Sequence, residues 1–181
     1  MYLKKYLPKI IVYYFPLVRI QHFLIDLSVV LSILFVFSYY ININSPYTAT
    51  KNIIDIAKII IPILTFQSTL HTTSIIFFAN SNATVLEKLR NEYINQNGQQ
   101  IKYKKIDQLY SYFSWSILVQ LFFLLYTLLI TVYLTNNSPE FFMIQYLKYH
   151  LFVLMFGVTY SIVLCLRNIG LFFSVLTYKQ D

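Results

Sequence analysis

Four long apolar blocks constrain this chain more than any other feature, because each is long enough to cross the hydrocarbon of a bilayer. A membrane-spanning helix needs about 20 predominantly apolar residues, and its backbone groups must be paired within the segment. The blocks cover approximately residues 20–41, 51–80, 109–134 and 146–173. The sequence therefore predicts an all-α integral membrane protein, a four-helix bundle that forms one transmembrane domain over residues 1–181.

Composition and the segments around the blocks agree with this interpretation. Only 12% of the residues are charged and 57% are hydrophobic, whereas about a quarter of a soluble domain is charged. Residues 1–19 combine lysines with tyrosines and a phenylalanine, which is typical of a segment lying in the headgroup region. Residues 140–150 either lie along the outer surface or belong to the fourth span, and the sequence leaves both alternatives open.

The distribution of basic residues predicts the orientation in the membrane. The N-terminal segment has four Lys or Arg residues, the loop at 80–108 has five and the C-terminal end has two, eleven in all. The opposite side has three, namely Lys51, Lys58 and Lys148. Because cytoplasmic segments carry the excess of Lys and Arg, we expect both termini and the 80–108 loop to be cytoplasmic. The predicted location is the cell (inner) membrane.

The second and third blocks continue beyond the length that a bilayer requires. No glycine or proline lies between Pro62 and Gly98, or between Gly98 and Pro139. We therefore expect the second and third helices to extend into the cytoplasm as an antiparallel helical hairpin over residues 81–108, with its tip at 95–99.

Such a hairpin has too little core to be stable alone, so its apolar side chains need a partner. The candidate partner-binding residues are its apolar and basic side chains: Leu86, Lys88, Leu89, Arg90, Tyr93, Lys102, Lys104 and Lys105. Five basic residues offset by three acids are typical of a solvated or headgroup-facing surface, so no direct nucleic-acid contact is expected.

Ionisable and amide groups inside the spans are candidate functional residues, because each costs free energy in hydrocarbon unless it finds a partner. Asp26, His71 and Arg167 are expected at a similar depth, and an ion pair between Asp26 and Arg167 would neutralise both charges. Such a group either clasps helices or subunits together or forms a proton or ion pathway. Gln120, in the middle of the third span, has the same two interpretations.

Two further patterns lie on helix faces. Thr65, Ser68, Thr69 and Thr72 share one face of the second helix, which either bonds to another helix or lines water. The other pattern, on the fourth helix, is a small-residue groove at every fourth position, Gly157, Ser161 and Cys165. It permits close helix packing, either within the chain or between copies.

No catalytic or metal-binding pattern is present in the sequence. Three histidines, one cysteine and seven acids show no H-x-x-x-H, C-x-x-C or G-x-S-x-G spacing, and three glycines form no glycine-rich loop. The expectation is a protein that is not an enzyme and that has no cofactor and no metal.

In overall plan the chain resembles the KwaA family, the membrane subunit of the Kiwa antiphage defence system. Four spans, short outer turns and an inner extension from Val85 to Asp107 carry the resemblance, which covers most of the chain and transfers no single residue. It implies a homo-oligomer that detects phage-induced membrane perturbation and controls KwaB, a cytoplasmic DNA-binding partner. The expected function is thus a membrane-embedded sensor or anchor subunit of a prokaryotic antiphage defence complex, docking its partner through the hairpin.

Two other functions stay open. A small oligomeric ion channel or transporter would use the polar face of the second helix together with Asp26 and Arg167. A colicin-type bacteriocin immunity protein is the third possibility, since such proteins also have four spans with cytoplasmic ends. A neighbouring toxin gene would favour the immunity protein, and a neighbouring gene for a soluble nucleic-acid-binding protein would favour the defence subunit.

Overall fold

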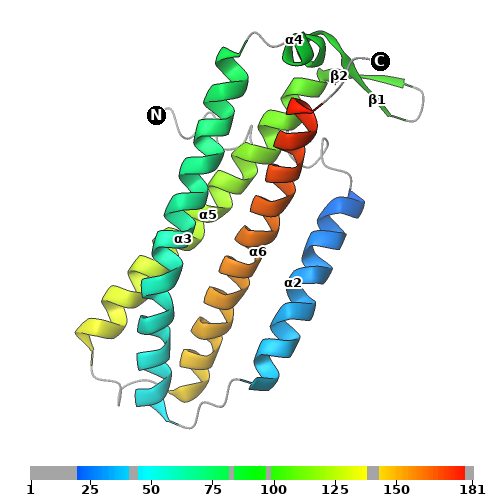
Figure 1. The fold of residues 1–181 in the computed structure, drawn as a ribbon. Helices are drawn as coiled ribbons and strands as arrows, with labels where there is room; N and C mark the ends of the chain where they lie inside the picture. Colours follow the sequence, from blue (N-terminus) through cyan, green and yellow to red (C-terminus); the bar gives the residue numbers. More distant parts are fainter. Residues whose placement is uncertain (1–19, 41–44, 82–83, 97–98, 138–142, 178–181) are drawn as a thin grey trace.

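The computed structural model describes residues 20–40, 45–81, 84–96, 99–137 and 143–177. This part of the chain is almost wholly helical, with one small β-hairpin (Figure 1). In chain order its elements are α2 (Ile20–Tyr40), α3 (Pro46–Asn80), α4 (Thr84–Asn91), β1 (Tyr93–Gln96), β2 (Gln99–Lys104), α5 (Lys105–Asn136) and α6 (Ile144–Leu176). Residues 1–19, expected to be interfacial, lie outside the described residues.

Three helices, α3, α5 and α6, are each long and apolar enough to cross a membrane. The apolar run of α2 is shorter, covering Phe23–Val36, so the fourth span stays a prediction. Large apolar side chains also face outward from the helices, among them Phe35, Phe66, Phe122 and Leu166. Apolar surface on this scale is typical of helices surrounded by lipid. The prediction of a membrane protein is therefore confirmed at the level of three candidate spans.

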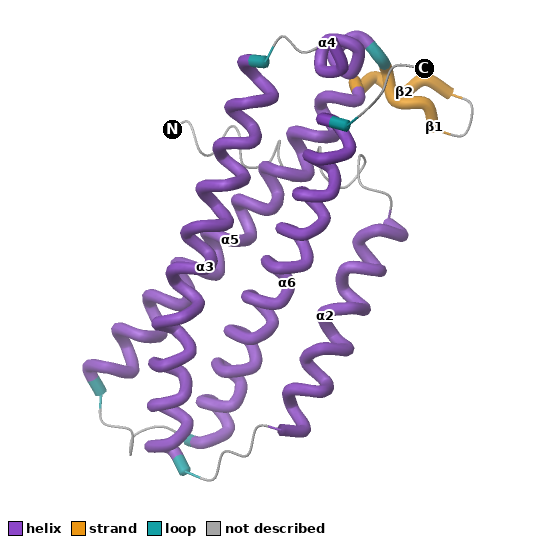
Figure 2. The backbone as a smooth tube through the Cα atoms, in the orientation of Figure 1, coloured by secondary structure: helices purple, strands orange, loops and turns teal. Residues whose placement is uncertain are grey.

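The long helices lie roughly side by side and alternate in direction (Figures 1 and 2). α3, α5 and α6 pack on one another, whereas α2 packs chiefly on α6. Two of the clusters of buried apolar side chains are formed by the long helices alone. One joins α3, α5 and α6 around Ile53, Leu134 and Leu151, and the other joins α2, α5 and α6 around Val30 and Leu164.

Local sequence explains where the helices begin. The Ser45 hydroxyl accepts a hydrogen bond from the Thr48 N–H, and Pro46 opens α3 with a residue whose missing N–H costs nothing there. At the start of α5 the Asp107 carboxylate accepts the Lys104 N–H at 2.9 Å. α6 begins at Ile144, so residues 144–150 belong to the long helix.

The prediction of a helical hairpin over residues 81–108 is wrong. α3 ends at Asn80, α4 is a separate helix of eight residues, and β1 and β2 form an antiparallel pair in which Gln96 lies opposite Gln99. The extension beyond the long helices exists, but its tip is a β-hairpin.

Two local signals account for this difference. The run Asn80-Ser81-Asn82 consists of residues whose short polar side chains favour caps and turns over helix interiors, so a helix can end there without glycine or proline. Asn97-Gly98 joins segments that contain tyrosine and isoleucine, and Asn-Gly between such segments is a strong signal for a two-residue β-hairpin.

Candidate functional site

An ion pair links α2 to α6 inside the bundle. Arg167 of α6 donates to the Asp26 carboxylate of α2, and the two side chains are only 16% and 11% exposed. The guanidinium carbon lies 4.8 Å from the centroid of the Tyr112 ring, which belongs to α5. The structure thus brings together the two charges that the sequence pairs, and an aromatic ring from a third helix adds a cation–π contact.

His71 and Gln120 join α3 to α5 in the interior of the bundle. Both are fully buried, and His71 Nδ1 lies 3.1 Å from the amide oxygen of Gln120. The same amide oxygen accepts a hydrogen bond from Ser68, and the amide nitrogen donates to Gln67, each at 3.3 Å. Gln120 therefore connects three side chains of α3. The direct hydrogen bond of His71 goes to Gln120 and not to the ion pair.

Asn168 adds a connection that sequence reasoning missed. It is fully buried, and its amide nitrogen donates to the Ser116 hydroxyl at 2.7 Å and to the Tyr112 carbonyl at 3.4 Å, so it joins α6 to α5. The available signal was an amide directly after Arg167 in an apolar block. We call the whole set the polar layer: Asp26, Gln67, Ser68, His71, Ser116, Gln120, Arg167 and Asn168.

The polar layer lies toward the end of the bundle at which α4 is found. His71 is nine residues before the end of α3 at Asn80, roughly 14 Å at 1.5 Å per residue. Arg167 is likewise nine residues before the end of α6 at Leu176. The positive charge of Arg167 and the negative charge of Asp26 pair with each other. The layer therefore determines which helices are neighbours without leaving a net charge from this pair in the bundle.

The four hydroxyl-bearing residues predicted to share one face of α3 do not all point the same way. Thr65, Thr69 and Thr72 are exposed, and each donates its hydroxyl to the carbonyl four residues earlier in α3. Ser68 instead turns inward to Gln120. The exposed threonines are paired within their own helix, so they need no neighbouring helix for their donors.

The small-residue groove of α6 is used within the chain. Gly157, Ser161 and Cys165 are all buried. A Cβ atom at Gly157 would collide with the ring of Phe123 in α5. Glycine at this position therefore permits the close approach of α5 to α6.

α4, β1 and β2 form a unit beyond the long helices that we call the head. Leu86 is 1% exposed and packs with Phe78, Ile106 and Leu109 at the end of the bundle. Nη2 of Arg90 donates to the carbonyls of Phe78, Ala79 and Ser81 at 2.8, 3.1 and 3.0 Å, which satisfies acceptors at the end of α3. Leu86 and Arg90, both predicted to bind a partner, therefore fasten the head to the bundle.

A cluster of three charged side chains connects the head to the start of α5. The Lys105 N–H donates to the Glu92 carbonyl at 2.9 Å, and Lys105 Nζ lies 2.6 Å from the Glu92 carboxylate. Lys88 Nζ lies 3.9 Å from the other carboxylate oxygen. The hydrogen bond from Lys105 holds the pKa of the Glu92 carboxyl below its ordinary value.

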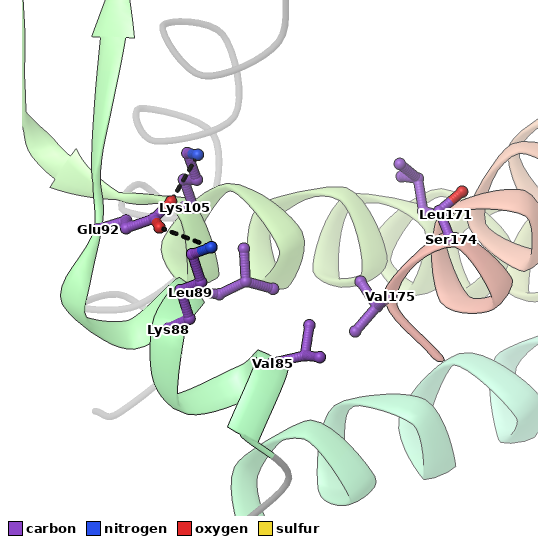
Figure 3. A pocket seen from close by; sticks show the side chains of 8 residues that line it. All are labelled: Val85, Lys88, Leu89, Glu92, Lys105, Leu171, Ser174 and Val175. Atoms are coloured by element: carbon purple, nitrogen blue, oxygen red, sulfur yellow. Dashed lines mark hydrogen bonds and ion pairs between the residues drawn. The ribbon is translucent and has the colours of Figure 1, made fainter. Parts of the chain in front are cut away.

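A groove of about 220 Å³ separates α4 from the end of α6 (Figure 3). Its apolar walls are Val85 and Leu89 on one side and Leu171 and Val175 on the other, and its polar end is formed by the cluster of Lys88, Glu92 and Lys105. Of the other predicted partner-binding residues, Lys104 caps α5 through its N–H. Tyr93 and Lys102 lie in the strands, and only their backbone is described.

Among the described residues no group of three or more His, Cys, Asp and Glu side chains is arranged to hold a metal ion. The polar layer and the groove beside the head are two places where this part of the chain gathers polar side chains. No protein family model, no curated protein and no solved structure matches the chain, so its function has to be inferred from these two regions.

Proposed function

We propose that this chain is the membrane-embedded sensor or anchor subunit of a prokaryotic antiphage defence complex, a homo-oligomer whose head docks a cytoplasmic, DNA-binding partner. Eleven basic residues on the side of the head against three on the other support a cytoplasmic head. The resemblance in overall plan to the membrane subunit of the Kiwa system supplies the defence context.

The observation that carries the proposal is the way in which the head is held. Arg90 binds three carbonyls at the end of α3, and Leu86 is buried in the end of the bundle. A polar unit fixed in this manner is held in place before a partner arrives, so binding has less to order. The exposed Lys88 and Lys105 give that surface positive charge, which favours an acidic face on the partner.

Trimming the β-hairpin tests the docking role without disturbing the bundle. Replacing residues 94–103 by Asn-Gly keeps Tyr93 opposite Lys104 and leaves Leu86 and Ile106 in their apolar cluster. The trimmed chain, co-expressed with the product of the neighbouring gene, should insert and elute like the intact chain. It should capture at least about tenfold less of that product in a pull-down, as expected when a central contact of an interface is removed.

The matched control is Lys51→Gln, which removes a lysine at the opposite end of α3 and should leave capture unchanged. Equal capture by the trimmed and intact chains would show that the hairpin is not the docking surface. A neighbouring toxin gene whose product the chain neutralises would replace the proposal with the immunity function.

A channel is the second candidate, and the exposed hydroxyls of Thr65, Thr69 and Thr72 favour it. Each hydroxyl donates within α3 but keeps acceptor capacity on the outer surface. In a ring of copies these threonines would line a polar path between subunits. Ion flux through liposomes that contain the purified chain alone, reduced by Thr69→Val, would favour the channel over the docking subunit.

A further inference from the structure

The groove between α4 and α6 combines an apolar channel with a charged end. Val85 and Leu89 face Leu171 and Val175 across it, and the Glu92 carboxylate lies at its mouth (Figure 3). Its volume of about 220 Å³ is below the 300–1,000 Å³ of usual small-molecule pockets. The groove therefore fits one narrow apolar chain with a polar end better than a compact organic ligand.

The position of the groove decides which kind of molecule reaches it. Leu171 and Val175 belong to the stretch Ile144–Val175, which is long and apolar enough to cross a membrane. The opposite wall is α4, a short helix that carries charges. A groove that joins the last turns of a span to a charged helix lies at the level of the lipid headgroups. In a bilayer that α6 crosses, lipid occupies this depth, whereas a soluble protein would have to displace that lipid.

The charges at the mouth alternate in sign. Glu92 lies between Lys105, at 2.6 Å, and Lys88, at 3.9 Å, and the three side chains are 35%, 47% and 50% exposed, respectively. Two lysines suit a phosphate, and the carboxylate suits a cation. Glu92 already accepts a primary ammonium from Lys105, so a second primary ammonium matches it in geometry. A trimethylammonium group has no N–H to donate, and a glycerol headgroup has no positive charge.

From this geometry we infer that the groove is a binding site for a phospholipid whose headgroup carries both a phosphate and a primary ammonium, as phosphatidylethanolamine does. Lys88 and Lys105 hold the phosphate, Glu92 accepts the ammonium, and one acyl chain begins between Leu89 and Val175. The inference concerns the membrane leaflet on the side of the head and does not depend on a protein partner.

The test uses the full chain reconstituted in vesicles of equal parts phosphatidylethanolamine, phosphatidylglycerol and phosphatidylcholine. After mild detergent extraction, the lipids retained per protein are counted by mass spectrometry. The intact chain should retain phosphatidylethanolamine with roughly two- to fivefold enrichment, the range that a half-exposed charge pair supports. Glu92→Gln should remove the enrichment, whereas Glu87→Gln, an exposed acid of α4 outside the groove, should keep it.

A second variant keeps the test independent of the charged cluster. Val175→Phe fills the apolar part of the groove and leaves every charge in place, so it should lower the number of retained lipids. Retention in the vesicle ratio by the intact chain, or unchanged lipid counts in Val175→Phe, would overturn the inference. If Glu92→Gln and Val175→Phe both lose protein capture while the number of retained lipids is unchanged, the inference is overturned as well. The groove would then be assigned to a protein segment.

Discussion

The polar layer and the head both contain charged groups, but they bond them to different partners. In the layer, side chains of different helices bond to one another. Asp26 and Arg167 are 141 residues apart in the sequence, and His71 and Gln120 are 49 residues apart. In the head, Arg90 bonds to main-chain carbonyls, and Lys105 bonds to a carboxylate only 13 residues away. The layer therefore determines which helices are neighbours, whereas the head is fastened to a helix end that already exists.

The surroundings of the two regions differ as much as their partners. A charge buried inside the bundle has no water to replace a lost partner, so breaking its pair is costly. A half-exposed charge in the head exchanges its partner for water and is screened by salt. We therefore expect the effects of substitution to decrease from the ion pair in the layer, through Arg90, to the charged cluster around Glu92.

The largest effect is expected for the ion pair of the layer. Asp26→Ala or Arg167→Ala alone leaves the opposite charge buried without its partner, which should lower the free energy of unfolding by about 3–5 kcal/mol. The double substitution should cost clearly less than the sum, because neither charge remains. Unfolding in mixed micelles, followed for the two single variants and the double variant, measures this coupling.

The chain offers a matched exposed pair as a control. Lys58 and Asp55 lie 2.9 Å apart in α3, with side chains 69% and 52% exposed. Lys58 is 22 residues before the end of α3 at Asn80, roughly 33 Å at ~1.5 Å per residue, so the pair lies beyond the ~30 Å of hydrocarbon counted from that end. Breaking this pair should cost at most about 1 kcal/mol. If the effects of Asp26→Ala and Arg167→Ala simply add, or match those of the exposed pair, the contrast between a desolvated layer and a solvated head does not hold.

Arg90 should have an intermediate and local effect. Arg90→Lys keeps the charge, but the lysine side chain is one atom shorter and lacks the rigid planar guanidinium, so its ammonium should not reach all three carbonyls that Nη2 contacts at the end of α3. Hydrogen bonds to charged groups contribute about 1.5–3 kcal/mol, so amide hydrogen exchange over residues 84–91 should become about tenfold faster or more. Amide exchange in the centre of α5 should not change. In the control variant Glu87→Gln, exchange over residues 84–91 should stay as in the intact chain. Faster exchange throughout the bundle would mean that Arg90 stabilises the helices rather than the head.

These regions also differ in how far the sequence predicts them. The three candidate spans follow from apolar length, and α6 at Ile144–Leu176 lies within three residues of the predicted 146–173 at either end. The pairing of Asp26 with Arg167 follows from charge and depth alone, because the spans hold few charges to choose among. Asn168 escaped prediction because the partner of an amide depends on how each helix is rotated. Packing contacts such as that of Gly157 with Phe123 set that rotation.

The head escaped prediction for a different reason. The expectation of a helical hairpin counts only glycine and proline as helix breakers, although Asn and Ser, which follow one another at Asn80 and Ser81, are residue types that favour helix ends because their side chains compete for backbone hydrogen bonds. The role of Arg90 could not be deduced before the end of α3 was known, because the carbonyls that it binds exist only at that end. Short segments outside the spans are thus decided by local turn chemistry and by tertiary contacts, both of which apolar length ignores.

The smallest effect is expected for the charged cluster, and it should depend on pH. The hydrogen bond from Lys105 holds the pKa of Glu92 below its ordinary value of 4.5. A carboxyl with a lowered pKa in the folded head stabilises the head fully above its unfolded pKa. That contribution is lost as pH falls through the lowered value. Local stability of residues 84–92 should therefore be constant from about pH 8 to 5 and should fall only in more acidic solution.

Glu92→Gln isolates this contribution, because the amide does not titrate and Asp107 remains in both chains. Hydrogen exchange of residues 84–92 should differ between the two chains at neutral pH, and the difference should disappear at acidic pH once Glu92 is protonated. Since the Lys105–Glu92 pair is half exposed, raising the salt concentration should shrink the difference at neutral pH as well. A difference that persists unchanged at acidic pH or in high salt would show that Glu92 holds the head through its backbone carbonyl, which accepts the Lys105 N–H at 2.9 Å, rather than through its charge.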